Sequence, residues 1–355
     1  MNKHISESIR PEIQALMAYP VPSSAGFIKL DAMENPHPFP AELKAELLAA
    51  LSEASLNRYP DASAATLRAA IREAMQIPPN MEIMLGNGSD EIIQIIALAL
   101  AKPGSTLLSF EPSFVMFKMI ATFCGLNYVG VPLTADFEID LPATRQAISQ
   151  HQPAVTFIAY PNNPTGNLFS RDAIREIIRL SPGLVVIDEA YFAFSSDSFL
   201  DEIASFPNAV LMRTVSKLGL AGLRLGFLIG HPVWISEFDK LRLPYNINSL
   251  TQAAALVALK HYDSLLAQAK TLRQERARML EALGEISGVT VYPSEANFVL
   301  VRVPESAQTY AALLSRKILV KHTGSAHLLL KNTLRLTIGT MTENNALLSA
   351  LEDTV

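Results

Sequence analysis

Residues 209–229 read AVLMRTVSKLGLAGLRLGFLI, two apolar runs on either side of a turn that contains a single lysine, Lys217. Short apolar runs bounded by glycine and polar residues are typical of strands buried on both faces of a sheet. A lone lysine is most often a solvated surface charge, but Lys217 follows a strand and has small and apolar neighbours. These neighbours can remove water from the amine and lower its pKa, as a nucleophilic lysine requires.

The same pattern extends to both sides of this stretch. We expect strands at residues 106–110, 128–131, 155–159, 184–187, 209–213 and 225–229, with helices between most of them, notably at 91–101, 115–124 and 170–179. This alternation predicts an α/β fold with a mostly parallel sheet covered by helices on both faces. Ligands of such sheets bind at the carboxyl ends of the strands, so the residues that follow each strand are the candidates for function.

The chain has 355 residues, too many for one ordinary core, and its pattern changes after residue 245. A long helical stretch, residues 250–283, precedes short strands and helices that indicate an α+β unit. We therefore predict an N-terminal arm, residues 1–30, that packs on the small domain, a large domain, residues 31–245, and a small C-terminal domain, residues 246–355.

The composition narrows the classes of function. A net charge of −5, with 49% hydrophobic and 18% charged residues, gives no sign of a nucleic-acid or membrane partner. The single cysteine, Cys124, and the polar start of the chain predict a cytoplasmic protein. The seven histidines lack the spacing of a metal site, so no metal is expected.

Residues 85–91, LGNGSDE, stand directly before the predicted helix at 91–101. Two glycines permit a tight turn, and the start of the helix offers free N–H groups to an anion, to which Ser89 adds a hydroxyl. Ser89 or Asp90 could equally be an ordinary helix N-cap. A dinucleotide-binding motif does not fit, because Glu91 occupies the place of its third glycine.

Two more polar turns follow predicted strands. Residues 160–166, YPNNPTG, could hold a ligand oxygen through an amide, although asparagine and proline also form purely structural turns. Residues 188–191, DEAY, place Asp188 at the end of a buried strand, where its carboxylate needs a cationic partner. A magnesium nucleotide is excluded because the chain has no G-x-x-x-x-G-K-[ST]. A protonated pyridine nitrogen is the alternative.

In this order, the Asn-Pro-Thr-Gly, Asp-x-x-Tyr and Ser-Lys…Arg elements resemble those of the fold-type I pyridoxal-phosphate (PLP) enzymes, the aspartate aminotransferase superfamily. Within it, the chain is most similar to the histidinol-phosphate aminotransferases, from the arm to Thr340. The resemblance implies a fold-type I PLP-dependent transferase, with PLP as cofactor and a homodimer with shared active sites.

The resemblance also implies roles for individual residues. Lys217 would carry the cofactor as a Schiff base and then move a proton between substrate and cofactor. Asp188 would keep the ring nitrogen protonated, while Asn163 and Tyr191 would hydrogen-bond the ring oxygen. The other cofactor contacts implied are the phosphate ligands Ser89, Asp90, Thr214, Ser216 and Arg224, the stacking ring of Phe114, where tyrosine is common, and Tyr59 of the neighbouring subunit.

For the substrate, Arg335 matches the family's anion-binding arginine, which can hold a carboxylate or a phosphate bidentately. Lys321 stands where the family often has a second arginine, so the charge is kept but the forked geometry is lost. Tyr19 matches a tyrosine near the substrate phosphate, and Asn163 and Asn297 are further candidates for substrate contact. Lys217 and Arg224 are seven residues apart where much of the family has eight, which predicts a different path for this loop.

The expected reaction is transamination of L-histidinol phosphate with 2-oxoglutarate, which gives imidazole-acetol phosphate and L-glutamate, a step of histidine biosynthesis. Two other PLP enzymes remain as alternatives: an aromatic amino-acid aminotransferase and a decarboxylase of a phosphorylated amino acid. A PLP-binding regulator without turnover is a third possibility, but the thirty residues before the fold are too few for a DNA-binding segment.

Overall fold

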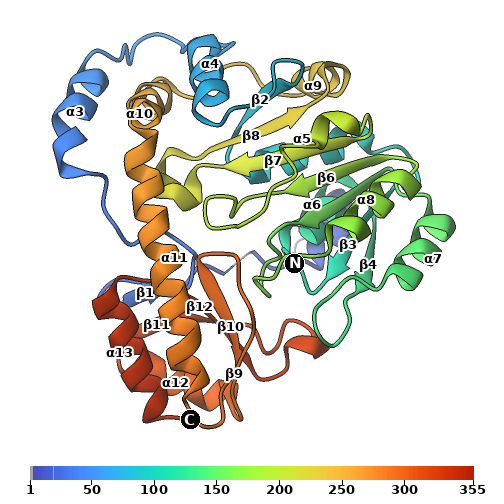
Figure 1. Cartoon of the computed structure of the whole chain (residues 1–355). Helices are drawn as coiled ribbons and strands as arrows, with labels where there is room; N and C mark the ends of the chain where they lie inside the picture. Colours follow the sequence, from blue (N-terminus) through green and yellow to red (C-terminus); the bar gives the residue numbers. More distant parts are fainter. Residues whose placement is uncertain (1–2, 19) are drawn as a thin grey trace.

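Two sheets of unequal size organise the chain in the computed structural model, which describes residues 3–18 and 20–355 (Figure 1). The larger sheet has seven strands in the order β2-β8-β7-β6-β5-β3-β4. All of them are parallel except β8, which is antiparallel to both β2 and β7. The predicted α/β fold with a mostly parallel sheet is thereby confirmed. The strands are β2 (Glu82–Asn87), β3 (Thr106–Glu111), β4 (Asn127–Pro132), β5 (Val155–Ala159), β6 (Leu184–Asp188), β7 (Ala209–Thr214) and β8 (Leu225–Gly230).

Both faces of this sheet are covered by helices, which explains why its strands are apolar throughout. Along β6, Val186 points into one core, and Val185 and Ile187 point into the other. The first core is shared with α5 (Ser89–Leu100), α6 (Met116–Cys124) and α9 (Pro232–Asp239). The second is shared with α4 (Ala65–Ala74), α7 (Leu141–His151) and α8 (Arg171–Leu180), and it continues into the smaller sheet.

The smaller sheet has five strands in the order β1-β11-β12-β10-β9. β1 runs parallel to β11, and the other pairs are antiparallel. Three helices, α11, α12 and α13, lie beside this sheet (Figure 1). The elements are β1 (Ile28–Leu30), β9 (Thr290–Val291), β10 (Phe298–Arg302), β11 (Ile318–His322), β12 (Thr333–Thr337), α11 (Tyr262–Gly284), α12 (Ser306–Ser315) and α13 (Met341–Glu352).

The helical stretch expected at residues 250–283 consists of two helices. α10 (Ser249–Lys260) packs against α3 (Lys44–Ser52) and α4, beside the larger sheet, and α11 continues to the smaller sheet (Figure 1). Residues 249–260, which the sequence assigned to the small domain, therefore pack with the larger unit. We propose a domain division near residue 261, because a domain is defined by the core that its helices share.

The N-terminal arm contacts both units rather than the small domain alone. Near its start, where α1 (Lys3–Ser8) and α2 (Pro11–Gln14) lie, Arg10 donates from Nη2 to the carbonyl of Phe123 at the end of α6, 2.6 Å away. A cation at a helix C-terminus satisfies carbonyls that have no helical partner. Only the end of the arm, at β1, joins the smaller sheet. Among the helices of the described residues, none has the length and hydrophobicity that a membrane span requires.

A buried ion pair fixes the turn that follows β6. Arg213 of β7 donates to Glu189 Oε2 from Nε (3.0 Å) and Nη2 (2.8 Å), and Glu189 Oε1 accepts the N–H of Phe199 at 2.6 Å. Glu189 is 0% exposed and Arg213 is 5% exposed. Because neither charge can reach water, each depends on the other, and the turn that carries Asp188 and Tyr191 is held in place.

The Arg213→Met variant should be destabilised by about 3–5 kcal/mol, because the charge of Glu189 would then be buried without a cation. Urea unfolding followed by circular dichroism measures this loss. The Lys240→Met variant is the matched control, since it breaks an exposed pair with Glu237 and should cost less than about 1 kcal/mol. Equal stability of Arg213→Met and the wild type would contradict this role of the pair.

Candidate active site

One cavity, of about 110 Å³, opens at the carboxyl ends of β5, β6 and β7. This is the edge at which parallel sheets bind ligands, because the strand ends and the turns after them meet there. Ten residues predicted from sequence line it together: Ser89, Asp90, Phe114, Asn163, Asp188, Tyr191, Thr214, Ser216, Lys217 and Arg224.

Among the titratable groups that line the cavity, Lys217 and Asp188 have the pKa values that burial shifts furthest. Lys217 lies in a 3₁₀ turn after β7, and its Nζ donates to the carbonyl of Ala32 at 3.2 Å. Desolvation lowers the pKa of Lys217 to about 8, and the positive charge of Arg335 acts in the same direction. Burial raises the pKa of Asp188 to about 7, although the N–H of Ala190, 3.1 Å from Oδ1, opposes this shift. Both shifts favour the neutral form, so the cavity provides a reactive amine and a buried carboxyl group that forms no ion pair with any of the described residues.

The start of α5 and the side chain of Arg224 form an anion cradle. Gly88 is the N-cap of α5, and no side chain caps it, so the first N–H groups of the helix are available to a ligand. The alternative in which Ser89 or Asp90 is the N-cap is therefore wrong. A Cβ on Gly88 would lie only 2.6 Å from Arg224 Nη2, and one on Gly226 only 2.7 Å from the nitrogen of Ser89. Two glycines thus keep this space open.

The hydroxyls of Thr214 and Ser216 lie beside this cradle, at the end of β7. Thr214 Oγ1 lies 2.8 Å from Ser216 Oγ and 3.0 Å from the carbonyl of Leu225, and it accepts the N–H of Ser216 at 3.1 Å. Thr214 is therefore engaged within the turn and orients Ser216, whose hydroxyl is the better placed of the two for a ligand.

A chain of hydrogen bonds connects the smaller sheet to the cavity. Arg335 of β12 donates from Nη1 to Asn163 Oδ1 (2.6 Å), and Asn163 Nδ2 donates to the hydroxyl of Tyr191 (3.1 Å). The other end of the guanidinium donates from Nη2 to the carbonyl of Asp31 at 2.7 Å. Lys321 is the direct neighbour of Arg335 on β11, so the register places two cations side by side on the sheet.

None of the other predicted residues that the structure describes lines the cavity. Tyr59 is 80% exposed and stacks on Tyr245 with ring centres 4.4 Å apart. Asn297 is buried and donates from Nδ2 to the carbonyl of Met33 at 2.9 Å. Tyr19 falls outside the described residues. Met33 lines the cavity but was missed from the sequence, because an apolar residue after an arm carries no signal of function.

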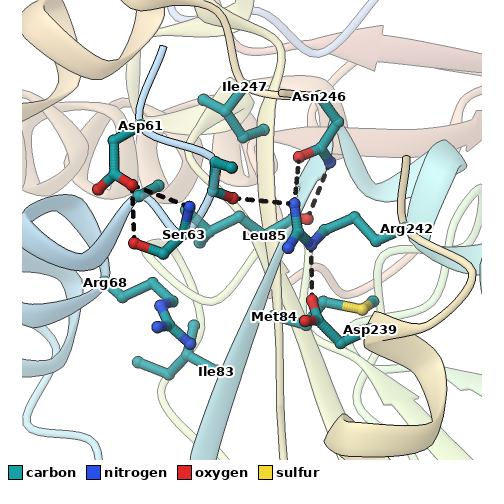
Figure 2. Close-up of a pocket in the computed structure, with 12 residues that line it drawn as sticks. Asp61, Ser63, Arg68, Ile83, Met84, Leu85, Asp239, Arg242, Asn246 and Ile247 are labelled. Carbon is teal, nitrogen blue, oxygen red and sulfur yellow. Dashed lines mark hydrogen bonds and ion pairs between the residues drawn. The ribbon is translucent and has the colours of Figure 1, made fainter. Parts of the chain in front are cut away.

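A second cavity, of about 230 Å³, lies between α4, β2 and the end of α9 (Figure 2). Arg242 donates there to Asp239 Oδ1 at 2.6 Å and to Asn246 Oδ1 at 3.1 Å, and Ser63 Oγ donates to Asp61 Oδ1 at 2.8 Å (Figure 2). These side chains are paired by hydrogen bonds, and none of the predicted site residues that the structure describes lines this cavity. It is larger than the first, but no lysine is among the described residues that line it. Within the described part of the chain, no cluster of acidic, histidine and cysteine side chains could hold a metal ion.

Comparison with known proteins places this geometry in a family. Residues 25–351 match the family model of the class I and II aminotransferases. The histidinol-phosphate aminotransferase of Chromobacterium violaceum is 54% identical over 352 residues, which cover 99% of each chain. The crystal structure of the histidinol-phosphate aminotransferase from Clostridium acetobutylicum has a TM-score of 0.83 and 25% identity, and the match covers 91% of this chain and 98% of that one.

The structure of the Sinorhizobium meliloti histidinol-phosphate aminotransferase in complex with PLP shares the fold, with a TM-score of 0.86, 24% identity and coverage of 98% of this chain and 97% of that one. The family match and the full-length identity agree with the cavity described above. The chain therefore belongs to the class I and II aminotransferases, enzymes that use pyridoxal phosphate, and among them to the histidinol-phosphate aminotransferases.

Proposed function

We propose that this protein transfers the amino group of L-histidinol phosphate to 2-oxoglutarate and so produces imidazole-acetol phosphate and L-glutamate. Identity of 54% with a histidinol-phosphate aminotransferase along the whole chain supports this choice of substrate. The observation that carries it is the cavity itself, which combines the amine of Lys217, the buried carboxyl of Asp188 and an anion cradle. A pair of cations, Arg335 and Lys321, stands on the adjoining sheet.

The charged groups of the cavity are complementary to the phosphate and the ring nitrogen of PLP. The cradle between the start of α5 and Arg224 suits its phosphate, and a Cβ at Gly88 would obstruct that space. The carboxyl of Asp188, whose pKa is raised to about 7 by burial, gains the cation it lacks from the ring nitrogen. Once bound, PLP supplies an aldehyde that bonds to amines and a ring that accepts electron density.

The predicted residues that line the cavity have proposed parts in this reaction. Lys217 Nζ would bond to the cofactor at rest and, when free, would move the proton that transamination shifts. Asn163 and Tyr191, which already hydrogen-bond each other, would hold the ring oxygen, and Phe114 would pack on the ring. The N–H groups of Ser89 and Asp90, the hydroxyl of Ser216 and the guanidinium of Arg224 would hold the phosphate, with Thr214 as the support of Ser216.

The substrate anion is proposed to bind at the smaller sheet. Arg335 is anchored by Asn163 and by the carbonyl of Asp31, so its guanidinium is held in one orientation. In alternate half-reactions it would bind the carboxylate of glutamate and the phosphate of histidinol phosphate, with Lys321 beside it. Asn163, Asn297 and Tyr19 are proposed as further substrate contacts.

We also propose a homodimer in which Tyr59 completes the cavity of the neighbouring subunit. Tyr59 is 80% exposed and does not line the cavity of its own chain, and Leu56 (78%) and Leu243 (71%) are also strongly exposed. Large apolar side chains that face water in this way are typical of a protein interface. A cytoplasmic location is proposed because the chain has a single cysteine, as is usual in reducing compartments.

Mixing the PLP-loaded protein with L-histidinol phosphate alone should convert the cofactor absorbance to that of its amine form, and 2-oxoglutarate should reverse the change. Stopped-flow spectroscopy measures the rate of each half-reaction. The Lys217→Ala variant should lose the conversion, because no amine remains to move the proton. Faster conversion by an aromatic amino acid, or release of carbon dioxide without keto-acid turnover, would overturn the proposed reaction.

The Gly88→Ala variant should bind PLP at least about tenfold more weakly, because its Cβ would occupy the space beside Arg224 and charge-assisted hydrogen bonds would be lost. Fluorescence titration with PLP measures the affinity. Gly284→Ala is the matched control, since a Cβ there meets no atom within 4 Å and binding should not change. If the two variants bind PLP equally well, the cradle is assigned to the wrong place.

The Lys321→Ala variant should raise KM for histidinol phosphate by about tenfold, which corresponds to about 1.4 kcal/mol, and should affect glutamate less. The reason is that a phosphate dianion gains more from a second cation than a carboxylate does. Steady-state kinetics with each amino donor measure the split. Lys331→Ala removes an exposed lysine of the same domain and should change neither value. An equal loss for both donors would show that Lys321 does not distinguish them.

A further inference from the structure

A short strap, residues 31–35, leaves β1 of the smaller sheet and crosses to the active-site cavity. Its carbonyls are bound by the two main cations of the site, Asp31 by Arg335 Nη2 at 2.7 Å and Ala32 by Lys217 Nζ at 3.2 Å. Beyond them, Asn35 donates from Nδ2 to the carbonyl of Leu218, the residue after Lys217, at 3.4 Å. The strap therefore contacts the substrate side and the cofactor side of the site at once.

Met33, in the middle of the strap, has an unusual backbone that is clamped on both sides. Its φ is +52°, in the left-handed region that residues other than glycine, asparagine and aspartate rarely adopt. Its N–H donates to Thr337 Oγ1 at 3.1 Å, and its carbonyl accepts from Asn297 Nδ2 at 2.9 Å. Thr337 is 2% exposed and Asn297 is 1% exposed, so both clamps are excluded from water. Such a conformation persists only where its surroundings impose it.

We propose that Met33 and Thr337 are positioning residues. Their clamped left-handed turn points the carbonyl of Ala32 at Lys217, and this carbonyl accepts a hydrogen bond from the lysine amine whenever the amine is not bonded to the cofactor. This inference rests on the proposed role of Lys217 and adds to it. The free amine must remain close to the reacting atoms during the proton transfer, and an acceptor at a fixed place limits its rotamers. The carbonyl of Asp31, on the same strap, accepts a hydrogen bond from Arg335 and so keeps the guanidinium group oriented relative to the strap.

The hydrogen bond from Lys217 to the carbonyl of Ala32 determines the direction in which the pKa of the lysine should change. A carbonyl stabilises an ammonium group more than a neutral amine, so the Ala32 carbonyl opposes the desolvation that favours the neutral form. Other ionisable groups around Lys217 include the carboxyls of Glu34, Asp90 and Asp188 and the guanidinium groups of Arg335 and Arg224. The ring of Tyr191 lies with its centre 6.0 Å from Lys217 Nζ. A substitution at Thr337 replaces none of these groups. A change in the titration of Lys217 therefore reports on the strap, which carries Glu34 and holds Arg335 as well as the carbonyl of Ala32.

The test is the Thr337→Val variant, which has nearly the same shape but cannot accept the N–H of Met33. In the full-length protein freed of PLP, labelling of Lys217 by an amine reagent near pH 7, read by mass spectrometry, should become about three- to tenfold faster as the pKa of the amine falls. Thr337→Ser should restore wild-type labelling. In the loaded enzyme kcat should fall, while the affinity for PLP stays at the wild-type value.

Thr309→Val is the matched control, because Thr309 is also 2% exposed in the small domain but bonds only within its own helix. Its labelling should equal that of the wild type. If Thr337→Val does not fold, Met33→Val and Met33→Gly ask the same question, since valine resists the left-handed conformation and glycine accepts it. Faster labelling is then expected for valine alone.

Wild-type labelling of both Thr337→Val and Met33→Val would overturn the inference. Labelling needs neither substrate nor turnover, so a wild-type protein that fails to transaminate histidinol phosphate refutes the proposed function and leaves the strap to be judged separately.

Discussion

Removal of water from the amine of Lys217 is the condition on which the site depends. A solvated lysine is almost entirely protonated at neutral pH, whereas desolvation lowers the pKa of this one to about 8 and so leaves roughly a tenth of the amine neutral at pH 7. The same dry environment raises the pKa of Asp188 to about 7. Both groups come from the ends of adjacent buried strands, β6 and β7, and the sheet thus delivers them to one place without exposing the strands.

The smaller sheet completes that environment from the opposite side. It supplies Arg335, which hydrogen-bonds Asn163 on the larger unit, and Asn297, which holds Met33 at the wall of the cavity. Arg276 of α11 strengthens the junction, since its Nη1 donates to the carbonyls of Phe194 (3.1 Å) and Ala296 (2.9 Å), one on each unit. Anion binding at the small sheet and amine chemistry at the large one are therefore connected by direct hydrogen bonds.

The sequence predicted the bounds of an element best where every residue of that element is buried. Strand β5 has the predicted bounds, because a continuous apolar run needs no distant partner to be recognised. Strand β2 was not predicted, since an edge strand with Glu82 and Gly86 lacks a continuous apolar run. Helices α7 and α9 were missed as well. The sequence could not show that α10 packs on the larger unit, because its apolar face fits either core.

The candidate site was predictable residue by residue only where a motif follows a strand. Lys217, Asp188 and Asn163 each belong to a motif at the carboxyl end of a strand, and all three line the cavity. Met33 could not be found in this way. Its partner Thr337 lies 304 residues further along the chain, and a left-handed backbone at a methionine is not indicated by the local sequence. The N-cap of α5 was also ambiguous, since Gly88, Ser89 and Asp90 are all good capping residues.

The most direct measurement is the titration of Asp188 by ¹³C NMR of protein labelled at aspartate, with the Asp188→Asn variant used to assign the signal. In the protein without PLP the carboxyl should titrate near pH 7, and addition of PLP should keep it ionised at that pH because the ring nitrogen becomes its cation. A carboxyl that titrates in the ordinary range of aspartate, or that does not respond to PLP, would contradict the proposal that desolvation prepares this cavity for a cationic ring.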